Sequence, residues 1–403
     1  TTPQDKPAPR AHNNLAAHFL RLATNTPLPN LSESARQFTI EIIREHASIS
    51  PDSDWTKAAK MYNLTTIPKI TSSSHTVSRE LDKPTVRTSK DPLHCWFHNV
   101  NGFVTRWNEP KGDIKKIIAE AGFPDFFAFQ ETKASWFTIL SKCPGLLEWL
   151  EAHGYNYTYC SWSTRAEELE KNLSGFAGIL VISRIKPVSV VYGFAHKPSE
   201  GGDARLITAI FANIVVSCCY APYNNQLSPR MQARKKWDTE VLEHCSHITS
   251  AHTGKSFIYG GDLNVLPSIE DVDHGAFSNL RQTLPPGATP GRSQDDLEAY
   301  SKLLERTGMI NVKSFLNHGA RLRTQWISPS HKAADIGQTC DHILATKNLI
   351  NNTGRSTEDT PLALQIVAFK IKQKLGGHKG QSDHCPIGVE LNWTRPTPSK
   401  ALQ

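Results

Sequence analysis

Polar side chains that could bind a metal ion and a phosphate lie at the ends of four short apolar runs of the sequence. Each apolar run predicts a buried strand. Asn99 and Asn101, Glu131 and Lys133, and Asp262 and Asn264 come directly after such a run, while Asp383 and His384 come just before the run 387–391. Because a rigid sheet can hold groups at its strand ends within reach of one another, these positions are candidates for one shared site.

The types of these residues indicate which chemistry the site could perform. The three carboxylates offer oxygen ligands for a hard cation, and the asparagines add amide oxygens and hydrogen-bond donors. A small set of ligands with room for water suits Mg²⁺, which keeps part of its hydration shell and binds substrate phosphate. His384 can act near neutral pH, or face a phosphate as a cation. Together these groups predict metal-assisted phosphoryl transfer rather than a thiol or serine hydrolase.

Each fragment alone also has an ordinary structural interpretation. Asn101-Gly102 is a common turn sequence, and the segment from Asp262 to Asn264 could cap a helix. Asp383 and His384 could form a turn before a strand, and Glu131 could be a surface residue. The presence of the whole ordered set on one chain favours chemistry over these readings.

The elements that would position this site alternate along residues 91–403. We expect strands at Phe126–Gln130, 179–183, 206–211, Ile214–Tyr220, 257–259, 342–345 and 387–391. We expect helices at 113–122, 230–244 and 289–307, the last with Thr289 as its N-cap and Pro290 in its first turn. Strands with helices between them predict a layered α/β domain with sheet in the middle.

Residues 1–90 differ from the remainder and are expected to form an N-terminal extension. They contain short helix-like segments, followed at 71–90 by a Ser/Thr-rich stretch without an apolar period, which predicts a linker. The extension contains no recognisable chemical motif. Because the chain begins with Thr1 rather than Met, a targeting peptide could have been removed from it.

Composition limits the classes of protein to consider. The chain has 403 residues with 45 Lys plus Arg against 38 Asp plus Glu, and its formal charge of +7 suits a polyanionic partner. No apolar run reaches the roughly 18–20 residues needed to cross a bilayer, so we expect no membrane partner. The eight cysteines include no Cys-x-x-Cys pair. We therefore expect free, buried thiols in an intracellular protein rather than a structural zinc site.

The ordered blocks resemble the exonuclease III branch of the endonuclease/exonuclease/phosphatase superfamily, whose members act as abasic-site endonucleases. The matching blocks extend from about residue 96 to 391. They include Asn99-Val100-Asn101-Gly102, Gln130-Glu131-Thr132-Lys133, Tyr220-Ala221-Pro222, Arg234-Lys235-Lys236-Trp237-Asp238, Gly261-Asp262-Leu263-Asn264-Val265, Cys340-Asp341-His342 and Ser382-Asp383-His384-Cys385-Pro386. The Gln-Glu-Thr-Lys and Arg-x-x-Trp-Asp blocks are more typical of this branch than of its phosphatase relatives.

The resemblance implies a fold, a reaction and partners. The fold would be a four-layer α/β sandwich, with two packed β-sheets flanked by helices, carrying the N-terminal extension. The reaction would be Mg²⁺-dependent hydrolysis of the phosphodiester 5′ to an abasic site in double-stranded DNA, and Mn²⁺ could substitute for Mg²⁺. It would leave a 3′-hydroxyl and a 5′-deoxyribose phosphate, with 3′-phosphodiesterase and 3′–5′ exonuclease side activities. We expect a nuclear (or, with a targeting peptide, mitochondrial) monomer whose extension binds other repair proteins.

The resemblance also implies roles for individual residues around the metal and the attacking water. Glu131 would hold the metal ion, assisted by Asn101 and by Asp383. Relatives carry either Asp or Asn at the position of Asn101. Asp262 would orient or deprotonate the attacking water, and Asn264 would bind the phosphate beside it.

Further roles concern the transition state. Asn99 would hold the polar network of the site. Tyr220 would lie against the scissile phosphate as phenol or phenolate, although a tyrosine that only caps the core is the plain alternative. Asp341 would orient His384, which with the metal would stabilise the negative charge of the pentacoordinate phosphate.

DNA binding should depend mainly on phosphate contacts. The candidates are Lys133, Arg106, Arg205 and Arg230, although each could equally be a solvated surface charge, and Trp326 falls in the region expected to line the abasic pocket. Two departures put the shape of that pocket in doubt. Residues 333–339 lack the bulky aromatic residue that relatives carry before Asp341, and Tyr223 stands where they usually carry Asn.

Two other hypotheses remain open from the sequence. The chain could be another phosphoesterase of the same superfamily, such as a general nuclease, an RNA-trimming enzyme or an inositol-phosphate phosphatase. From a different class, it could be a catalytically silent DNA-binding or scaffold protein that keeps the fold. Loss of Glu131, Asp262 or His384 would have been the signature of a silent protein, and all three are present.

Overall fold

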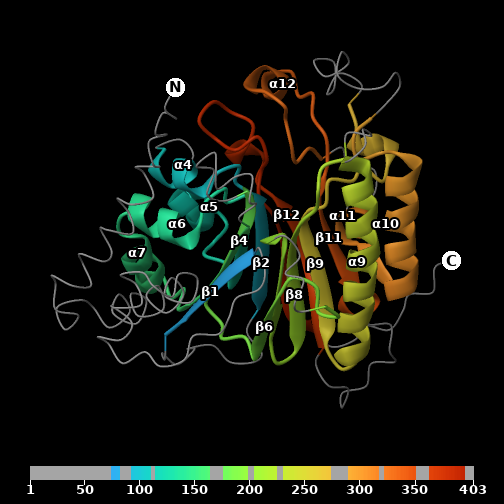
Figure 1. Cartoon of the computed structure of the whole chain (residues 1–403), viewed down its shortest axis with the longest axis horizontal. Helices are drawn as coiled ribbons and strands as arrows, with labels where there is room; N and C mark the ends of the chain where they lie inside the picture. The colour runs from blue at the N-terminus through green and yellow to red at the C-terminus, as the bar shows by residue number, and fades with distance from the viewer. Residues whose placement is uncertain are drawn as a thin grey trace, which may run out of the picture. The chain divides into compact units, whose positions relative to one another are not determined.

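The structure of the protein is a computed structural model that describes residues 74–81, 92–109, 114–163, 176–197, 204–224, 230–273, 289–316, 322–350 and 363–394. All of these lie in one compact unit, made of Ser73–Leu169 and Leu173–Gln403. The helix-like segments expected in the extension fall outside the described residues, and so does the predicted linker except residues 74–81. Two β-sheets form the centre of the unit (Figure 1).

The first sheet has seven strands in the order β1-β4-β5-β3-β2-β13-β12. Its members are β1 Ser74–Glu80, β2 Leu93–Asn99, β3 Phe126–Gln130, β4 Tyr157–Ser163, β5 Phe176–Ser183, β12 Ala363–Ile371 and β13 Ile387–Thr394. Strands β2 and β3 run parallel, with Asn99 opposite Gln130, and every other pairing in this sheet is antiparallel. The carboxyl ends of β2 and β3 therefore meet at the same edge as the start of β13.

The second sheet has six strands in the order β10-β11-β9-β8-β7-β6. Its members are β6 Ser189–Tyr192, β7 Leu206–Ile210, β8 Ile214–Tyr220, β9 Ser256–Asp262, β10 Met309–Asn311 and β11 Asp341–Thr346. Strands β8 and β9 are parallel, with Tyr220 opposite Asp262, and β11 runs antiparallel to β9 with Asp341 opposite Asp262. This sheet thus repeats the arrangement of the first, with two parallel strand ends beside the start of an antiparallel strand.

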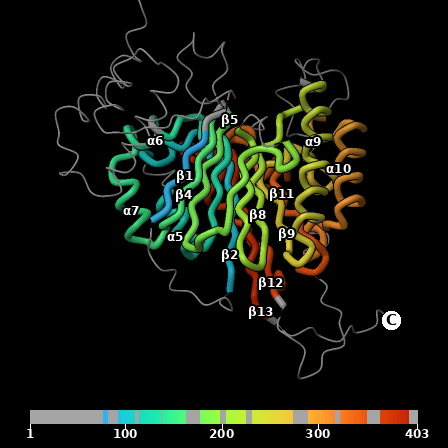
Figure 2. The backbone as a smooth tube through the Cα atoms, turned by 60° about the horizontal axis from the view of Figure 1, so that its bottom comes forward, coloured from blue at the N-terminus to red at the C-terminus, as the bar shows by residue number. Residues whose placement is uncertain are grey.

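Helices cover the outer faces of the two sheets (Figures 1 and 2). On the side of the first sheet lie α4 Phe103–Asn108, α5 Ile114–Glu120, α6 Trp136–Lys142 and α7 Leu146–Ala152. On the side of the second lie α9 Arg230–Ala251 and α10 Gln294–Thr307. Shorter helices are α11 Val312–Leu316 and α12 Pro329–Ala333, with 3₁₀ turns at Ile269–Asp271, Lys347–Leu349 and Gln373–Leu375. None of the helices in the described part has the length and apolarity that a bilayer crossing requires.

The main core lies between the sheets. Alternate side chains of both sheets fill it, among them Phe97, Phe126, Val216, Ile258 and Ile387, all at most 1% exposed. A second core packs the outer face of the six-stranded sheet against α9 and α10. The expected four-layer α/β sandwich is confirmed. All eight cysteines are free and buried, as the sequence predicted.

Two expectations about individual elements were wrong. The linker expected at 71–90 contains the edge strand β1, which pairs with β4 and so belongs to the compact unit of the two sheets. Edge strands are held by backbone hydrogen bonds, and Thr76, Ser78 and Glu80 of β1 are exposed, so the strand carries little apolar pattern. Helix α10 begins after Ser293, not at Thr289, because Ser293 and Asp296 form a capping box.

Candidate active site

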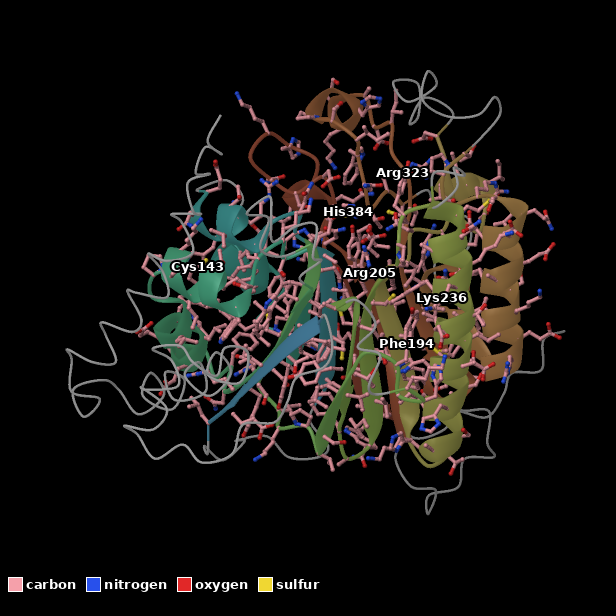
Figure 3. All side chains as sticks on the ribbon, viewed as in Figure 1. Cys143, Phe194, Arg205, Lys236, Arg323 and His384 are labelled. Carbon is pink, nitrogen blue, oxygen red and sulfur yellow. The ribbon has the colours of Figure 1, made fainter. Side chains whose placement is uncertain are left out.

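The candidate site lies where corresponding strand ends of the two sheets meet (Figure 3, at the label of His384). Asn99 ends β2, Glu131 follows β3, Tyr220 ends β8 and Asp262 ends β9, while Asp341 begins β11. The parallel register of β2 with β3 and of β8 with β9 brings these ends to one edge of the sandwich. Parallel strands place their carboxyl ends together, and ligand sites commonly form there.

Asp262 is almost completely enclosed, and it is 2% exposed. The Nδ2 atom of Asn99 donates to its Oδ2 at 2.9 Å, and the backbone N–H of Asn264 donates to its Oδ1 at 3.0 Å. Burial raises the pKa of Asp262 to about 7, although the nearby His384 and these hydrogen bonds oppose the shift. A carboxyl group that ionises near neutral pH is suited to accept a proton from water.

His384 is held among three carboxylates. Its Nδ1 is 2.9 Å from Oδ2 of Asp341, while its Nε2 lies 3.9 Å from Oδ2 of Asp262 and 4.0 Å from Oδ2 of Asp383. Burial by itself lowers the pKa of His384, but Asp341 and Asp383 outweigh burial and raise it to about 10. The imidazole therefore carries a proton on each nitrogen near neutral pH, and Nε2 presents a positive charge to the site.

The backbone around His384 is fixed independently of its ring. The Oγ atom of Ser382 accepts from the backbone N–H of His384 at 3.2 Å and donates to the carbonyl of Asn99 at 2.6 Å. Gly376 packs directly on this segment, since a Cβ atom at that position would lie 2.2 Å from the carbonyl oxygen of His384. Any side chain at Gly376 would displace the histidine.

Oxygen atoms that could ligate a cation converge on the other side of the site. Lys133 Nζ donates to Oδ1 of Asn101 at 2.5 Å and lies 3.4 Å from Oε2 of Glu131. The ammonium group of Lys133 thus bridges Asn101 and Glu131, which are two of the three residues that the sequence assigned to a metal ion. The third, Asp383, accepts from Nδ2 of Asn101 at 2.8 Å. Carboxylate and amide oxygens are the donors that Mg²⁺ uses, so the residues present fit such an ion.

Tyr220 lies opposite Asp262 in the sheet, and its side chain reaches Glu131 on the proposed metal side of the site. Its hydroxyl donates a short hydrogen bond to Oε1 of Glu131. Burial, together with Glu131, raises the pKa of Tyr220 above its ordinary value, which favours the phenol over the phenolate. Arg205 stacks on the ring at 4.6 Å and donates to the Tyr220 carbonyl at 3.2 Å.

Three residues at the turns of the site have left-handed backbone. Asn101, Glu131 and Asn264 have φ values of 47°, 54° and 46°. Such values are uncommon outside glycine, and they cluster at functional sites where surrounding contacts impose them. They turn the chain sharply as each strand ends.

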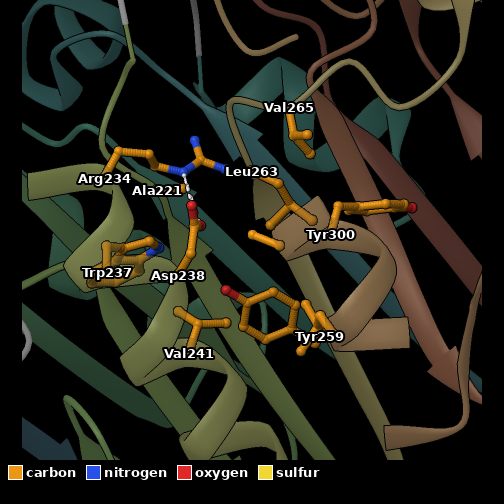
Figure 4. Close-up of a pocket in the computed structure, with 11 residues that line it drawn as sticks. Ala221, Arg234, Trp237, Asp238, Val241, Tyr259, Leu263, Val265 and Tyr300 are labelled. Carbon is orange, nitrogen blue, oxygen red and sulfur yellow. Dashed lines mark hydrogen bonds and ion pairs between the residues drawn. The ribbon is translucent and has the colours of Figure 1, made fainter. Parts of the chain in front are cut away.

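Arg234 on α9 ties two loops of the site to the helix layer, and Figure 4 shows its contact with Asp238 of the same helix. Its Nε donates to both carboxylate oxygens of Asp238, at 2.9 and 3.0 Å. Its Nη1 donates to the carbonyl of Pro222 at 3.1 Å and to that of Asn264 at 2.9 Å. The loops that follow β8 and β9 are therefore held by one buried guanidinium. Trp237 of the same helix packs in the helix–sheet core.

The residues predicted to contact DNA differ in how far their side chains are exposed. Arg205 is 5% exposed and Trp326 is fully buried, so neither side chain is open at the surface of this structure, and their contact with DNA stays a prediction. Both were assigned from sequence position, which carries no information on what covers a side chain. Arg106 is partly buried and donates to the carbonyls of Val100 and Gly380. Lys133 is exposed beside the site, and the side chain of Arg230 is outside the described part.

The structure adds neighbours that sequence reasoning did not single out. Cys340 Sγ lies 4.0 Å from Nδ1 of His384. Gln325 Nε2 donates to Oδ2 of Asp383 at 3.4 Å, and Gln338 donates to Gln325. No local signal identifies the two glutamines, because the contacts that bring them to the site join segments far apart in the chain.

Comparison with known proteins places this site in a family. The sequence model of the Endonuclease/Exonuclease/phosphatase family matches residues 97–384. This range contains every residue of the site described above. The chain belongs to the Endonuclease/Exonuclease/phosphatase family.

Individual relatives are distant. The chain is 23% identical over 318 residues to the DNA repair nuclease APEX1 of Danio rerio, covering 77% of this chain and 87% of the relative. It is 24% identical over 329 residues to a DNA-(apurinic or apyrimidinic site) endonuclease of Dictyostelium discoideum, covering 80% of this chain and 77% of the relative.

Solved structures show the same fold. An AP endonuclease from Archaeoglobus fulgidus aligns with a TM-score of 0.54 at 22% identity, over 74% of this chain and 98% of that chain. A 3′ phosphatase from Neisseria, bound to a product DNA hairpin, aligns with a TM-score of 0.56 at 18% identity, over 75% of this chain and 100% of that chain. These findings confirm the predicted family and fold, and with them the prediction of an enzyme of the nuclease and phosphatase class.

Proposed function

We propose that this protein is a Mg²⁺-dependent endonuclease that hydrolyses the phosphodiester 5′ to an abasic site in double-stranded DNA. The products would be a 3′-hydroxyl and a 5′-deoxyribose phosphate. The observation that carries the proposal is the joint placement of the buried Asp262 and the Asp341–His384 pair opposite the oxygens of Glu131, Asn101 and Asp383. The names of the relatives from Danio rerio and Dictyostelium discoideum support DNA and abasic sites as the target.

The residues of this chain divide the reaction between them. Asp262 accepts the proton of the attacking water, since its pKa near 7 leaves it largely ionised in mildly alkaline solution. Asn99 and Asn264 hold its two oxygens in place. His384 faces the phosphate with Nε2 and stabilises the charge that grows on its oxygens, while Asp341 fixes the ring. Tyr220 offers a neutral hydroxyl beside the same position.

Glu131, Asn101 and Asp383 would hold the metal ion. When bound, the ion would neutralise phosphate charge and assist departure of the 3′-oxygen. Lys133, whose ammonium contacts Glu131 and Asn101, would have to leave these oxygens and would then be free to bind a neighbouring phosphate.

The direct test is incision of a labelled duplex with one central abasic analogue, compared with the same duplex undamaged, with Mg²⁺ or with excess chelator. We expect a single cut on the 5′ side of the analogue that requires Mg²⁺ and leaves a 3′-hydroxyl. Equal cutting of both duplexes would favour a general nuclease. DNA binding without any cutting would favour the silent scaffold. Removal of only a 3′-terminal phosphate would favour a phosphatase.

A further inference from the structure

Two glutamines lie beside the Asp383–His384 segment, on backbone segments that bond to each other. The backbone N–H of Gln325 donates to the carbonyl of Gln338 at 3.0 Å, and that of Gln338 donates to the carbonyl of Gln325 at 3.0 Å. Gln325 also forms an isolated bridge with His384. These paired contacts fix both residues relative to the histidine that faces the phosphate.

Their side chains form a polar chain that leads to Asp383. Gln338 Nε2 donates to Oε1 of Gln325, and Gln325 Nε2 donates to Oδ2 of Asp383 at 3.4 Å. The thiol of Cys340 lies 3.5 Å from the same Gln325 oxygen. The wall of the site next to Asp383 is therefore made of amides and a thiol rather than hydrocarbon.

One atom of this wall is unsatisfied. Gln338 is 6% exposed, and its Oε1 is buried with no hydrogen-bond partner among the described residues. A buried acceptor without a partner destabilises a folded protein by about 1–3 kcal/mol. An apolar side chain of similar length would avoid this penalty, so the amide is explained if a ligand supplies the missing donor.

Gln325 offers the route by which a ligand could reach this acceptor. It is only partly buried, and its amide stands between Gln338 and Asp383. A donor on the substrate that displaces either amide contact would let the pair rotate and satisfy the free oxygen. A substrate with only C–H groups at this place would leave the acceptor unpaired.

We propose that Gln325 and Gln338 bind a sugar hydroxyl of the nucleotide next to the scissile phosphate, and so favour substrates that carry one. This inference rests on the proposed endonuclease function. It predicts discrimination between two abasic sugars that differ in one group. The natural 2-deoxyribose site carries a hydroxyl at C1′, and its tetrahydrofuran analogue carries hydrogen there.

The experiment compares kcat/KM on two duplexes that are identical except for this sugar. One satisfied hydrogen bond in a desolvated site should favour the hydroxyl-bearing duplex by about tenfold. Gln338→Met should reduce the ratio to near one, with incision of the tetrahydrofuran duplex retained. Gln325→Met, at the more exposed position, should act in the same direction and provides the second variant. Gln373→Met is the matched control, since the Gln373 amide bonds to the carbonyl of Arg323 and is not part of this pair.

The outcomes separate the two proposals. If the wild-type enzyme cuts neither duplex, the endonuclease function is refuted, and this inference with it. If it cuts both with a ratio near one, only this inference is refuted. A wild-type preference that both glutamine variants retain would likewise overturn it, since the discrimination would then come from other residues.

Discussion

Replacement of Arg234 should separate the stability of the protein from the placement of its catalytic loops. Arg234→Met keeps an unbranched side chain of similar reach but removes the guanidinium. The change breaks the ion pair with Asp238, and it leaves the carbonyls of Pro222 and Asn264 without their donor. The first loss acts on stability, and the second acts on the loops that carry Tyr220 and Asn264.

The size of the stability loss follows from the burial of the pair. The side chain of Arg234 is 5% exposed and that of Asp238 is 16% exposed. Removal of one partner from a buried pair destabilises a protein by about 3–5 kcal/mol. Because Asp238 keeps some contact with water, we expect a loss near the lower end, about 3 kcal/mol. Burial raises the pKa of Asp238 to about 6 while Arg234 opposes the shift, so at pH 8 the wild-type pair is charged.

The double variant Arg234→Met, Asp238→Asn separates the effect on the placement of the loops from the effect on stability. It removes the unpaired charge, so about half of the lost stability should return. The two loop carbonyls stay unpaired in both variants. Because a displacement of about 1 Å in a reactive group can lower the rate by about 10², kcat should stay at least tenfold low in both, with a smaller change in KM.

The assays are urea denaturation and steady-state incision of the abasic-analogue duplex, both at pH 8. The interpretation of Arg234 as a positioning residue would be refuted by normal turnover in Arg234→Met. It would also be refuted if kcat recovered in the double variant in parallel with stability, because the lost charge pair alone would then account for both effects.

Three further predictions concern the site itself. Asp262→Asn and His384→Asn should each lower kcat by roughly 10²–10⁴ or more while duplex binding persists in a mobility-shift assay; near-normal incision by either variant would contradict the assigned roles. Lys133→Ala should lower the Mg²⁺ concentration needed for half-maximal metal binding, measured by calorimetry, because the ammonium that competes for Glu131 is gone; a weaker Mg²⁺ response would show that Lys133 supports the metal instead. Asp341→Asn should reduce the free energy of unfolding most below about pH 6.5. His384 is raised to a pKa of about 10 in the folded protein, so the pair stabilises the protein while the imidazole is protonated, and this contribution disappears as pH rises through about 10. A difference between wild type and variant that grows with pH would refute the interpretation of the pair.

The sequence determined the elements that have a strong local pattern. Runs such as Phe126–Gln130 and Ile214–Tyr220 are apolar along their length, and both are fully buried strands. The helix predicted from residue 230 follows from its composition and is longer than expected, reaching Ala251. The polar groups at the strand ends were also identifiable, because carboxylates and amides directly after a buried strand need either a partner or a ligand.

The tertiary structure alone decided the surroundings of those groups. Arg205 and Trp326 looked available to DNA in the sequence, yet segments distant in the chain cover them, and charge or ring type does not reveal such cover. The edge strand β1 lacks an apolar pattern because its pairing with β4 is made by the backbone. The contact between Gln325 and Gln338, and the anchoring of two loops by Arg234, depend on approaches between segments 12 to 30 residues apart. Hydrophobic periodicity records which face of an element is buried, but the partners that complete a site are fixed only when the two sheets pack together.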